Sequence, residues 1–567
     1  ETGKTQVSQL DGIGKAMPRT MLMFGLATLG MAALPPMSGF IAKWFLGVGA
    51  WDAGEWPVLV VLVASSVLNL AYFLPILVRA FLKDEPGMEG VEHVARREAR
   101  GTLSWPLTAT AVGALVLGLW TAVPYGPFDL ARQIASNVTG FLFPAFSFVA
   151  GLSLWVPPFL IFLIGIPIVV VLKGRARQVA LVATAGVALV DVLFMPQGTS
   201  WNLPFMGSEL VLLNADRLSL FTGYIFAIIT FLAVLYASVF AKKPRLHAYA
   251  LMYAATSMGA VFAGDWITLL IFWELMAVTS TLLIWENKGE AIGAGYRYLL
   301  FHGFGGGMLA AGIALTFLET GSLLLGAPMS GWSQFFLAVG IGVNAAFIPL
   351  HTWLPDAYPK AHVAASVFLS VYTTKTAVYA FARVFMAQTA PVPAFEAVAF
   401  MGAIMAVYGV TFAVFQNNMR KLLSYHIVSQ VGYMIAGVGL AGALGTATEA
   451  GVLGLDGGMA HVFNNILYKP LLFMTIGVVI WRTGQQTMDK LGGLWKKMPV
   501  TAIAFWVAAF SISGVPLFNG FVSKGMVITA AEEHSLILWI LLEAASFGTF
   551  LSFLKLGWFT FMRPAPG

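Results

Sequence analysis

Long apolar stretches alternate with short polar turns along almost the whole chain. A helical stretch of about 20 apolar residues is long enough to cross the roughly 30 Å hydrocarbon core of a bilayer. The pattern therefore predicts an all-α, polytopic transmembrane helix bundle. Its sixteen candidate spans lie near residues 20–46, 57–82, 103–124, 156–173, 177–196, 216–241, 246–263, 266–286, 291–318, 332–350, 366–386, 394–415, 420–441, 459–481, 499–526 and 536–562.

The polar turns between these spans are often basic. If successive spans alternate in direction, all of the basic turns, and the basic segment 78–101, fall on one side of the membrane. Because cytoplasmic loops carry an excess of Lys and Arg, we predict that this side is the cytoplasmic one. The turns are KGRAR (173–177), AKKPR (241–245), ENKGE (286–290), QNNMRK (416–421) and MDKLGGLWKKMP (488–499).

Two apolar stretches contain helix-breaking residues, and we predict a broken helix in each. Backbone groups freed at membrane depth must be buried in protein or face a water-filled cavity. In transport proteins, such breaks often lie on the ion path. The breaks contain Pro349, Pro355 and Pro359 in residues 343–366, and Gly514, Pro516 and Gly520 in residues 511–524.

The chain also contains a long internal repeat. LDGIGKAMPRT (10–20) is similar to LGGLWKKMPVT (491–501), and PPMSGFIAK (35–43) is similar to PLFNGFVSK (516–524), both at an offset of 481 residues. A repeat of this length indicates a whole membrane module, because it exceeds the period of any small repeat.

The repeat predicts a division of the chain into three parts. Residues 1–135 are expected to hold the C-terminal helices of a first module, about three spans, and residues 136–155 an interfacial connector. Residues 156–567 are expected to form a second module of about 13 spans, which stops before its last counterpart helix.

Composition agrees with a membrane protein and excludes several other classes. Of 567 residues, 59% are hydrophobic and only 10% are charged, against about a quarter charged in soluble domains. The absence of cysteine excludes disulfides, Cys-ligated zinc and Cys-ligated iron–sulfur clusters in this chain. The net charge of +6 comes from clusters that set membrane orientation, so we expect no nucleic-acid partner. We also expect no metal and no cofactor.

Ionisable residues inside the spans are the candidate functional groups. Each costs at least ~2.5–3.5 kcal/mol near the bilayer centre, so a partner or a function is expected for each. Glu274 lies in LLIFWELMAVTS, and Lys375, Lys469 and Lys524 lie in later spans; Lys43 is the repeat equivalent of Lys524. Together they predict a charged, proton-exchanging axis. The alternative for each residue is a structural ion pair within the bundle.

Histidines form a second candidate group, because histidine titrates near physiological pH and can shuttle protons. Paired histidines could instead ligate haem, although their spacing does not require it. By contrast, Asp216, Asp265 and Asp356 lie at span ends, where helix capping or interfacial solvation is expected. The histidines are His302, His351, His362, His426 and His461.

Six ordered segments resemble the antiporter-like membrane subunits shared by Mrp-type Na⁺/H⁺ antiporters and respiratory complex I. The resemblance covers about residues 200–560, and residues 1–125 resemble the C-terminal helices of a second such protein. The resemblance is to the D or A type of Mrp antiporter subunits, and the form SYHIVSQVGYM favours the D type. The segments are LLIFWELM, FIPLHTWLPDAY, TKTAVYAFARV, NNMRKLLSYHIVSQVGYM, HVFNNILYKPLLF and SGVPLFNGFVSK.

The resemblance implies a 14-helix module with two inverted five-helix repeats, each containing one broken helix. It also implies roles for individual residues. Glu274 takes the place of the family's glutamate on the fifth helix, and Lys375 that of the charged residue on the eighth. His461 and Lys469 match the eleventh helix, and Lys524 matches the twelfth.

One family residue is missing. The seventh-helix lysine would lie just before the PLH break, where this chain has Asn344. Either Lys375 or Arg297 then pairs with Glu274, or the module has lost this proton-transfer step. His351, His426 and Lys43 are further accessory candidates.

These observations predict a proton-translocating subunit of a multisubunit Na⁺/H⁺ or other monovalent cation/H⁺ antiporter in a bacterial cytoplasmic membrane. It would be a transporter rather than an enzyme, with other antiporter or respiratory-complex membrane subunits as partners. One alternative is a proton-pumping membrane-arm subunit of a complex I-like NADH:quinone oxidoreductase or a hydrogenase complex. Another is a non-transporting assembly scaffold.

Overall fold

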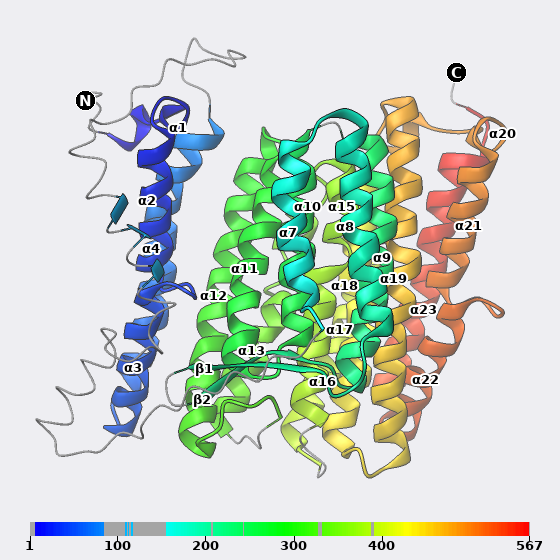
Figure 1. Cartoon of the computed structure of the whole chain (residues 1–567). Coiled ribbons are helices and arrows are strands. Elements are labelled where there is room, and N and C mark those ends of the chain that lie inside the picture. Colours follow the sequence, from blue (N-terminus) through cyan, green and yellow to red (C-terminus); the bar gives the residue numbers. More distant parts are fainter. Residues whose placement is uncertain are drawn as a thin grey trace, which may run out of the picture.

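A computed structural model describes most of the chain as a bundle of helices that run along one common axis (Figure 1). Nine of the described helices are long and apolar enough to cross a membrane, and two shorter apolar helices accompany them. The predicted polytopic helical bundle is therefore confirmed. The structure describes residues 6–83, 155–205, 208–241, 243–326, 331–386 and 391–565, with six positions between 108 and 116.

The N-terminal helices form a separate group at one side of the bundle (Figure 1). The prediction of one continuous span at 20–46 is wrong, because a helix ends at Met31 and the next begins at Ser38. Pro35 and Pro36 lack the backbone N–H that a continuing helix needs, and Ala33 has a positive φ of 58°. The elements are η1 (Val7–Gln9), α1 (Ile13–Ala16), α2 (Pro18–Met31), α3 (Ser38–Asp52) and α4 (Trp56–Leu82).

Two further predictions cannot be compared with the structure. Most of the predicted span 103–124 lies outside the described residues, and so does almost all of the predicted connector 136–155.

The helices of the second part follow the predicted order of spans. They are α7 (Pro158–Val171), α8 (Gly174–Phe194), α9 (Arg217–Phe240), α10 (Pro244–Phe262), α11 (Trp266–Trp285), α12 (Glu290–Thr320), α13 (Gly331–Asn344), α14 (Trp353–Ala357), α15 (Val363–Leu369), α16 (Tyr372–Met386), α17 (Glu396–Val414), α18 (Met419–Leu444), α19 (Glu449–Thr483), α20 (Leu494–Lys497), α21 (Pro499–Ser513), α22 (Asn519–His534) and α23 (Leu536–Gly557). Short turns of other helix types are η3 (Pro393–Phe395), η4 (Met488–Lys490) and η5 (Trp558–Met562).

Both predicted breaks are present, and the first is more extensive than the sequence suggested. Helix α13 ends at Asn344, before Pro349, and a further interruption separates α15 from α16 at residues 370–371. The second break separates α21 from α22, where Gly514 adopts a left-handed conformation with φ of 74°. Glycine accepts this conformation without the steric cost that a side chain would impose.

A small β-hairpin, which the sequence analysis did not predict, covers one end of the bundle (Figure 1). Strands β1 (Ser200–Phe205) and β2 (Ser208–Asn214) pair antiparallel, with Leu203 opposite Leu210. The hairpin is tied to the start of α11 by Asp265, whose carboxylate accepts the Val211 N–H at 2.6 Å.

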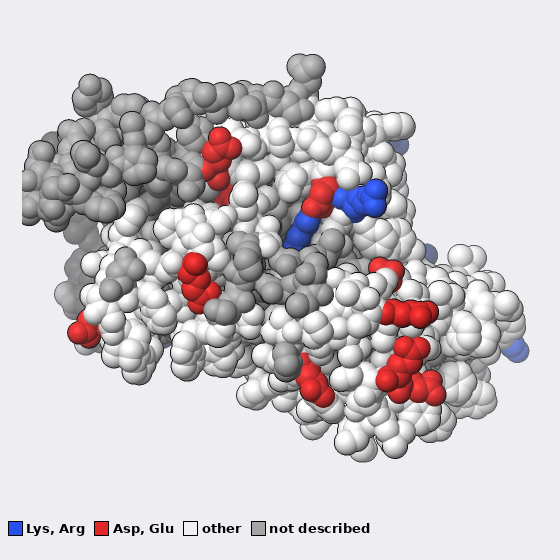
Figure 2. Space-filling model, turned by 90° about the horizontal axis from the view of Figure 1, so that it is seen from below, with Lys and Arg blue, Asp and Glu red and all other residues white. Residues whose placement is uncertain are grey.

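The basic turns meet at the other end of the bundle, as predicted. Figure 2, which views the hairpin end, shows a mostly uncharged face on which Asp and Glu side chains outnumber Lys and Arg. The two ends therefore differ in charge in the sense that the positive-inside rule requires. Contacts between these turns include the ion pair of Lys243 with Glu286 at 3.5 Å and the hydrogen bond from the Met488 N–H to the Asn417 carbonyl at 3.0 Å.

Asp265 anchors the N-terminus of α11, as its position at a span end suggested. It is fully buried and accepts hydrogen bonds from the Thr268 N–H and hydroxyl as well as from Val211. We expect Asp265→Ala to lower the free energy of unfolding by about 2–4 kcal/mol, because it removes a cap and leaves a buried N–H without an acceptor. Thermal unfolding of the detergent-solubilised protein measures the effect.

Thr448→Ala is the matched control. Thr448 caps α19 by accepting a single N–H, that of Gly451, so its loss should cost only about 1 kcal/mol. Equal shifts for the two variants would show that Asp265 is merely a cap.

Candidate functional site

Glu274 lies near the middle of α11 and is almost completely buried, with 4% of its surface exposed. Its carboxyl group packs directly on Gly306 of α12, where an added Cβ would lie 1.3 Å from Oε1. The carboxyl group makes no hydrogen bond or ion pair with any residue that the structure describes. Gly306, in the glycine-rich segment 301–312, therefore makes the space that the acid occupies.

A cavity of about 80 Å³ adjoins Glu274 and lies between the N-terminal helices and the second part of the chain. Lys43 of α3 lines the same cavity, and its ammonium group donates a hydrogen bond to Ser66 Oγ at 2.8 Å. The volume has room for several water molecules. Lys43, predicted as an accessory residue, thus lines the same cavity as Glu274.

Neither residue that was expected to replace the missing lysine pairs with Glu274. Arg297 instead binds the Asp356 carboxylate with Nε and Nη2, at 2.7 and 2.6 Å. Partial burial alone would raise the pKa of Asp356, but hydrogen bonds from Lys360 and Arg297 outweigh burial and hold this pKa below its ordinary value. The prediction for Arg297 is wrong because the arginine lies in the second turn of α12, close to the basic end of the bundle.

Lys375 is fully buried at the break between α15 and α16. Its ammonium group donates to the Ser370 carbonyl at 2.7 Å. Ser370 is the C-cap of α15, and the C-terminal end of a helix favours a cation through its dipole. The break, rather than an acid, therefore holds Lys375, and the predicted pairing with Glu274 is wrong.

Asn344, at the end of α13, faces a histidine. Both side chains are 1% exposed, and His302 Nδ1 is 2.8 Å from Asn344 Oδ1. The rings of Tyr298 and Trp353 pack against His302, with centroids 4.0 and 4.6 Å away. Two polar atoms of the pair, His302 Nε2 and Asn344 Nδ2, are buried without a hydrogen-bond partner.

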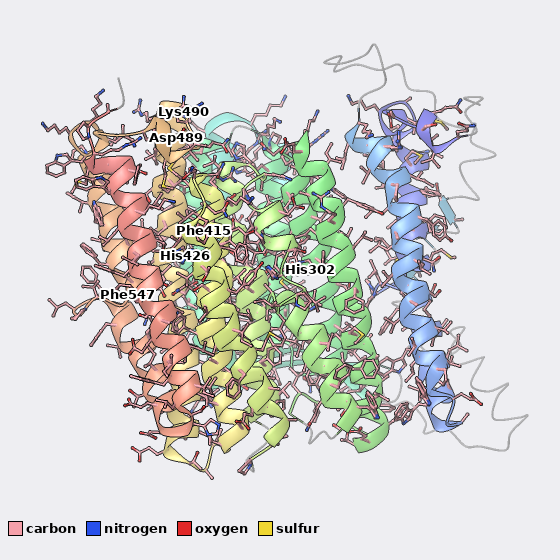
Figure 3. All side chains as sticks on the ribbon, turned by 180° about the vertical axis from the view of Figure 1, so that it is seen from behind. His302, Phe415, His426, Asp489, Lys490 and Phe547 are labelled. Carbon is pink, nitrogen blue, oxygen red and sulfur yellow. The ribbon has the colours of Figure 1, made fainter. Side chains whose placement is uncertain are left out.

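Lys469 and His426 share the ring of Phe553, on α23. Lys469 Nζ lies 5.8 Å from the ring centre and makes no hydrogen bond, and the His426 ring packs 4.6 Å from it. His426 Nε2 is also hydrogen-bonded to Ser552 Oγ. His426 and His302 lie at about mid-height in the bundle (Figure 3).

His461 connects α18, α19 and α22. Its two ring nitrogens are hydrogen-bonded to Ser523 Oγ at 3.0 Å and to Gln430 Oε1 at 3.1 Å. The adjacent Lys524 places Nζ 4.7 Å from the ring centre of Tyr433, a cation–π contact, and makes no hydrogen bond. The His461 ring centre lies 5.8 Å from that of Tyr433, so His461 and Lys524 contact the same tyrosine. Helix α16, which carries Lys375, packs against α19. The structure therefore brings together the helices that carry the predicted basic residues of the eighth, eleventh and twelfth spans.

The three lysines share one property: each is at most 2% exposed, and none takes part in an ion pair among the described residues. Buried lysines that lack an acid partner are suited to release and take up protons. The alternative of structural ion pairs is therefore wrong for Lys375, Lys469 and Lys524.

His351 lines a different cavity, which has a volume of about 400 Å³. Asp356, Lys360 and Glu290 line this cavity as well. His351 is 4% exposed, and its ring packs against Tyr408 with centroids 4.7 Å apart. This predicted accessory residue therefore lies toward the basic end. The described residues include no group of three or more His, Asp or Glu side chains that could hold a metal ion.

Sequence reasoning missed the neutral polar residues that connect these groups. Gln430 and Ser523 bind His461, and Tyr298 packs on His302. Their sequence signal is weak but real, because Ser523 directly precedes Lys524 and Tyr298 lies one helical turn before His302.

Gly306→Ala tests the packing around Glu274. The added methyl group must displace the carboxyl group, so we expect several-fold lower labelling of Glu274 by a hydrophobic carbodiimide, measured by mass spectrometry. Gly293→Ala on the same helix is the control, because its Cβ would meet only Arg297 Nη1, at 3.6 Å. Unchanged labelling in Gly306→Ala would refute the close contact.

Comparison with known proteins places these features in a family. Residues 1–69 and 263–552 match the family described as NADH:quinone oxidoreductase/Mrp antiporter, TM. A putative antiporter subunit mnhA2 of Staphylococcus saprophyticus is 30% identical over 55% of this chain and 42% of its own length. The chain thus spans less than half of that relative.

Two further proteins are similar. NADH-quinone oxidoreductase subunit N of Desulforudis audaxviator is 30% identical over 63% of this chain and 74% of its own length. A chain of the membrane-bound sulfane sulfur reductase, an archaeal respiratory membrane complex, superposes with a TM-score of 0.66 at 25% identity, covering 72% of this chain and 70% of that one. This chain belongs to the NADH:quinone oxidoreductase/Mrp antiporter transmembrane family.

Proposed function

We propose that this chain is a proton-translocating subunit of a multisubunit monovalent cation/proton antiporter. The observation that carries the proposal is the set of buried lysines that make no ion pair among the described residues, which extends from the broken helix α15–α16 to α22. The name of the staphylococcal relative, an antiporter subunit, supports it.

In the proposed mechanism, protons pass along the row of buried groups from Glu274 to Lys524. Two like charges 10 Å apart repel by roughly 1.7 kcal/mol at an effective dielectric of 20, which is more than a tenfold effect on protonation. Charging one lysine therefore disfavours charge on the next. Such coupling moves protons stepwise without covalent chemistry.

The transported cation and the partners are also part of the proposal. We infer Na⁺ or another monovalent cation, a bacterial cytoplasmic membrane, and other membrane subunits of the same complex as partners. Alkali cations prefer oxygen ligands, and we place their path in a partner subunit of the complex.

A redox-driven proton pump is the second candidate function. It is favoured by the NADH-quinone oxidoreductase relative and by the similarity to a respiratory complex. The same row of lysines would serve it, with electron transfer located in other chains. Proton uptake driven by a Na⁺ gradient without an electron donor supports the antiporter, whereas flux only with a donor supports the pump.

The test uses the assembled complex in vesicles that contain a pH-sensitive dye. Glu274→Gln and Lys375→Ala should each reduce cation-driven proton flux on the order of 100-fold, since each removes a proton-exchanging group. Lys490→Ala is the control, because Lys490 is exposed at the basic end of the bundle (Figure 3). Wild-type flux in both site variants would refute the relay and favour the assembly scaffold.

A further inference from the structure

The relay has a gap between its acid and its first lysine. Glu274 lies on α11 and Lys375 on α16, and no ion pair connects the two side chains. Helix α12 packs against α11, and three of its residues share one face because they are spaced four apart. These are Tyr298, His302 and Gly306.

The two ends of this face contact the two sides of the gap. Gly306 touches the carboxyl group of Glu274. Tyr298, two turns away, shares a hydrogen bond with Thr373 Oγ1 at 3.3 Å, and Thr373 lies two residues before Lys375 in α16. Tyr253 of α10 is hydrogen-bonded to the same Thr373 hydroxyl at 2.6 Å. One helix face thus reaches from the acid to the beginning of the lysine helix.

His302 occupies the middle of this face. Asn344 Oδ1 lies 2.8 Å from Nδ1 and can only accept, so a hydrogen bond between these two atoms requires the tautomer that has its proton on Nδ1. In the neutral ring, Nε2 then carries a lone pair, and this atom is buried without a partner. Buried polar atoms are nearly always hydrogen-bonded, and an exception calls for an explanation. Nε2 would have such an explanation if it bound and released a proton in turn.

We propose that His302 carries the proton between Glu274 and Lys375, an inference that rests on the proposed function above. The carboxylic acid of Glu274 releases its proton, by way of water, to Nε2, which gives a carboxylate and an imidazolium. Nδ1–H remains bonded to Asn344 throughout. Nε2 then releases the proton through water and the hydroxyl groups of Tyr298 and Thr373 to the neutral amine of Lys375, which becomes an ammonium.

Asn344 suits this role because its amide does not titrate. A lysine there would add a charge beside the imidazolium, whereas the amide oxygen fixes the ring and stabilises it in both protonation states. Asn344 is therefore a positioning residue, and His302 is the residue that binds and releases the transferred proton.

His302→Gln tests the proposal in the complete complex in dye-loaded vesicles. Glutamine retains hydrogen-bonding capacity but cannot carry a proton, so we expect proton flux to fall about tenfold or more. His247→Gln is the matched control: His247 is buried in α10 and bonded to the Ala241 carbonyl, away from this face. Its flux should stay close to that of the wild type.

A double variant distinguishes a shared path from a structural effect. If both groups lie on one path, Glu274→Gln with His302→Gln should be no slower than the slower single variant. If the reductions multiply instead, the two residues act independently and the proposal is overturned.

Asn344→Leu keeps the ring and removes its acceptor, and we expect an intermediate loss of flux. If the His302→Gln complex fails to assemble, the Asn344→Leu variant still tests whether His302 carries the proton. Wild-type flux in Asn344→Leu would overturn the proposal. Loss of flux in Glu274→Gln with wild-type flux in His302→Gln would also overturn it, while leaving the proposed function intact. No flux in the wild-type complex would instead remove the proposed function itself.

Discussion

An ionisable side chain in the hydrocarbon core of a membrane must be enclosed by protein, and the arrangement of this bundle follows from that requirement. The cost of exposing such a group to lipid amounts to several kcal/mol. Helices α11 and α18, which carry Glu274 and His426, have 78% and 89% of their most apolar window buried, against 17% for α4 and 22% for α8. The helices that carry Glu274 and His426 are therefore among the most enclosed of the described spans.

A buried charge also needs polar groups around it, because enclosure by apolar side chains does not solvate it. The helix breaks provide some of these polar groups. The end of α15 offers Lys375 a carbonyl group, and the turn at Gly514 packs on the side chain of Lys524, with Cδ 3.3 Å from where a Cβ would be. In each case, the break places irregular backbone beside a buried ammonium. The breaks are thus part of the electrostatic environment as well as of the helix geometry.

Much of this arrangement could be predicted from the sequence, because hydrophobic length and charge asymmetry act locally. The spans, the basic end, the two proline- and glycine-rich breaks and the buried Lys375, Lys469 and Lys524 all follow from such patterns. The interruption at residues 32–37 was missed, although the repeat aligns it with the break before Lys524. Partners across helices were not predictable, because they depend on how each helix is rotated: Arg297 turned out to bind Asp356, and Asn344 to bind His302.

The contact between Gly306 and Glu274 means that these two positions share a fixed volume. A longer side chain on α12 can be accommodated only if the acid on α11 becomes shorter, as with alanine opposite aspartate. The two residues are therefore expected to change together or not at all. The distance between α11 and α12 therefore fixes the position of the carboxyl group. A substitution at only one of the two positions would change either that distance or the position of the carboxyl group.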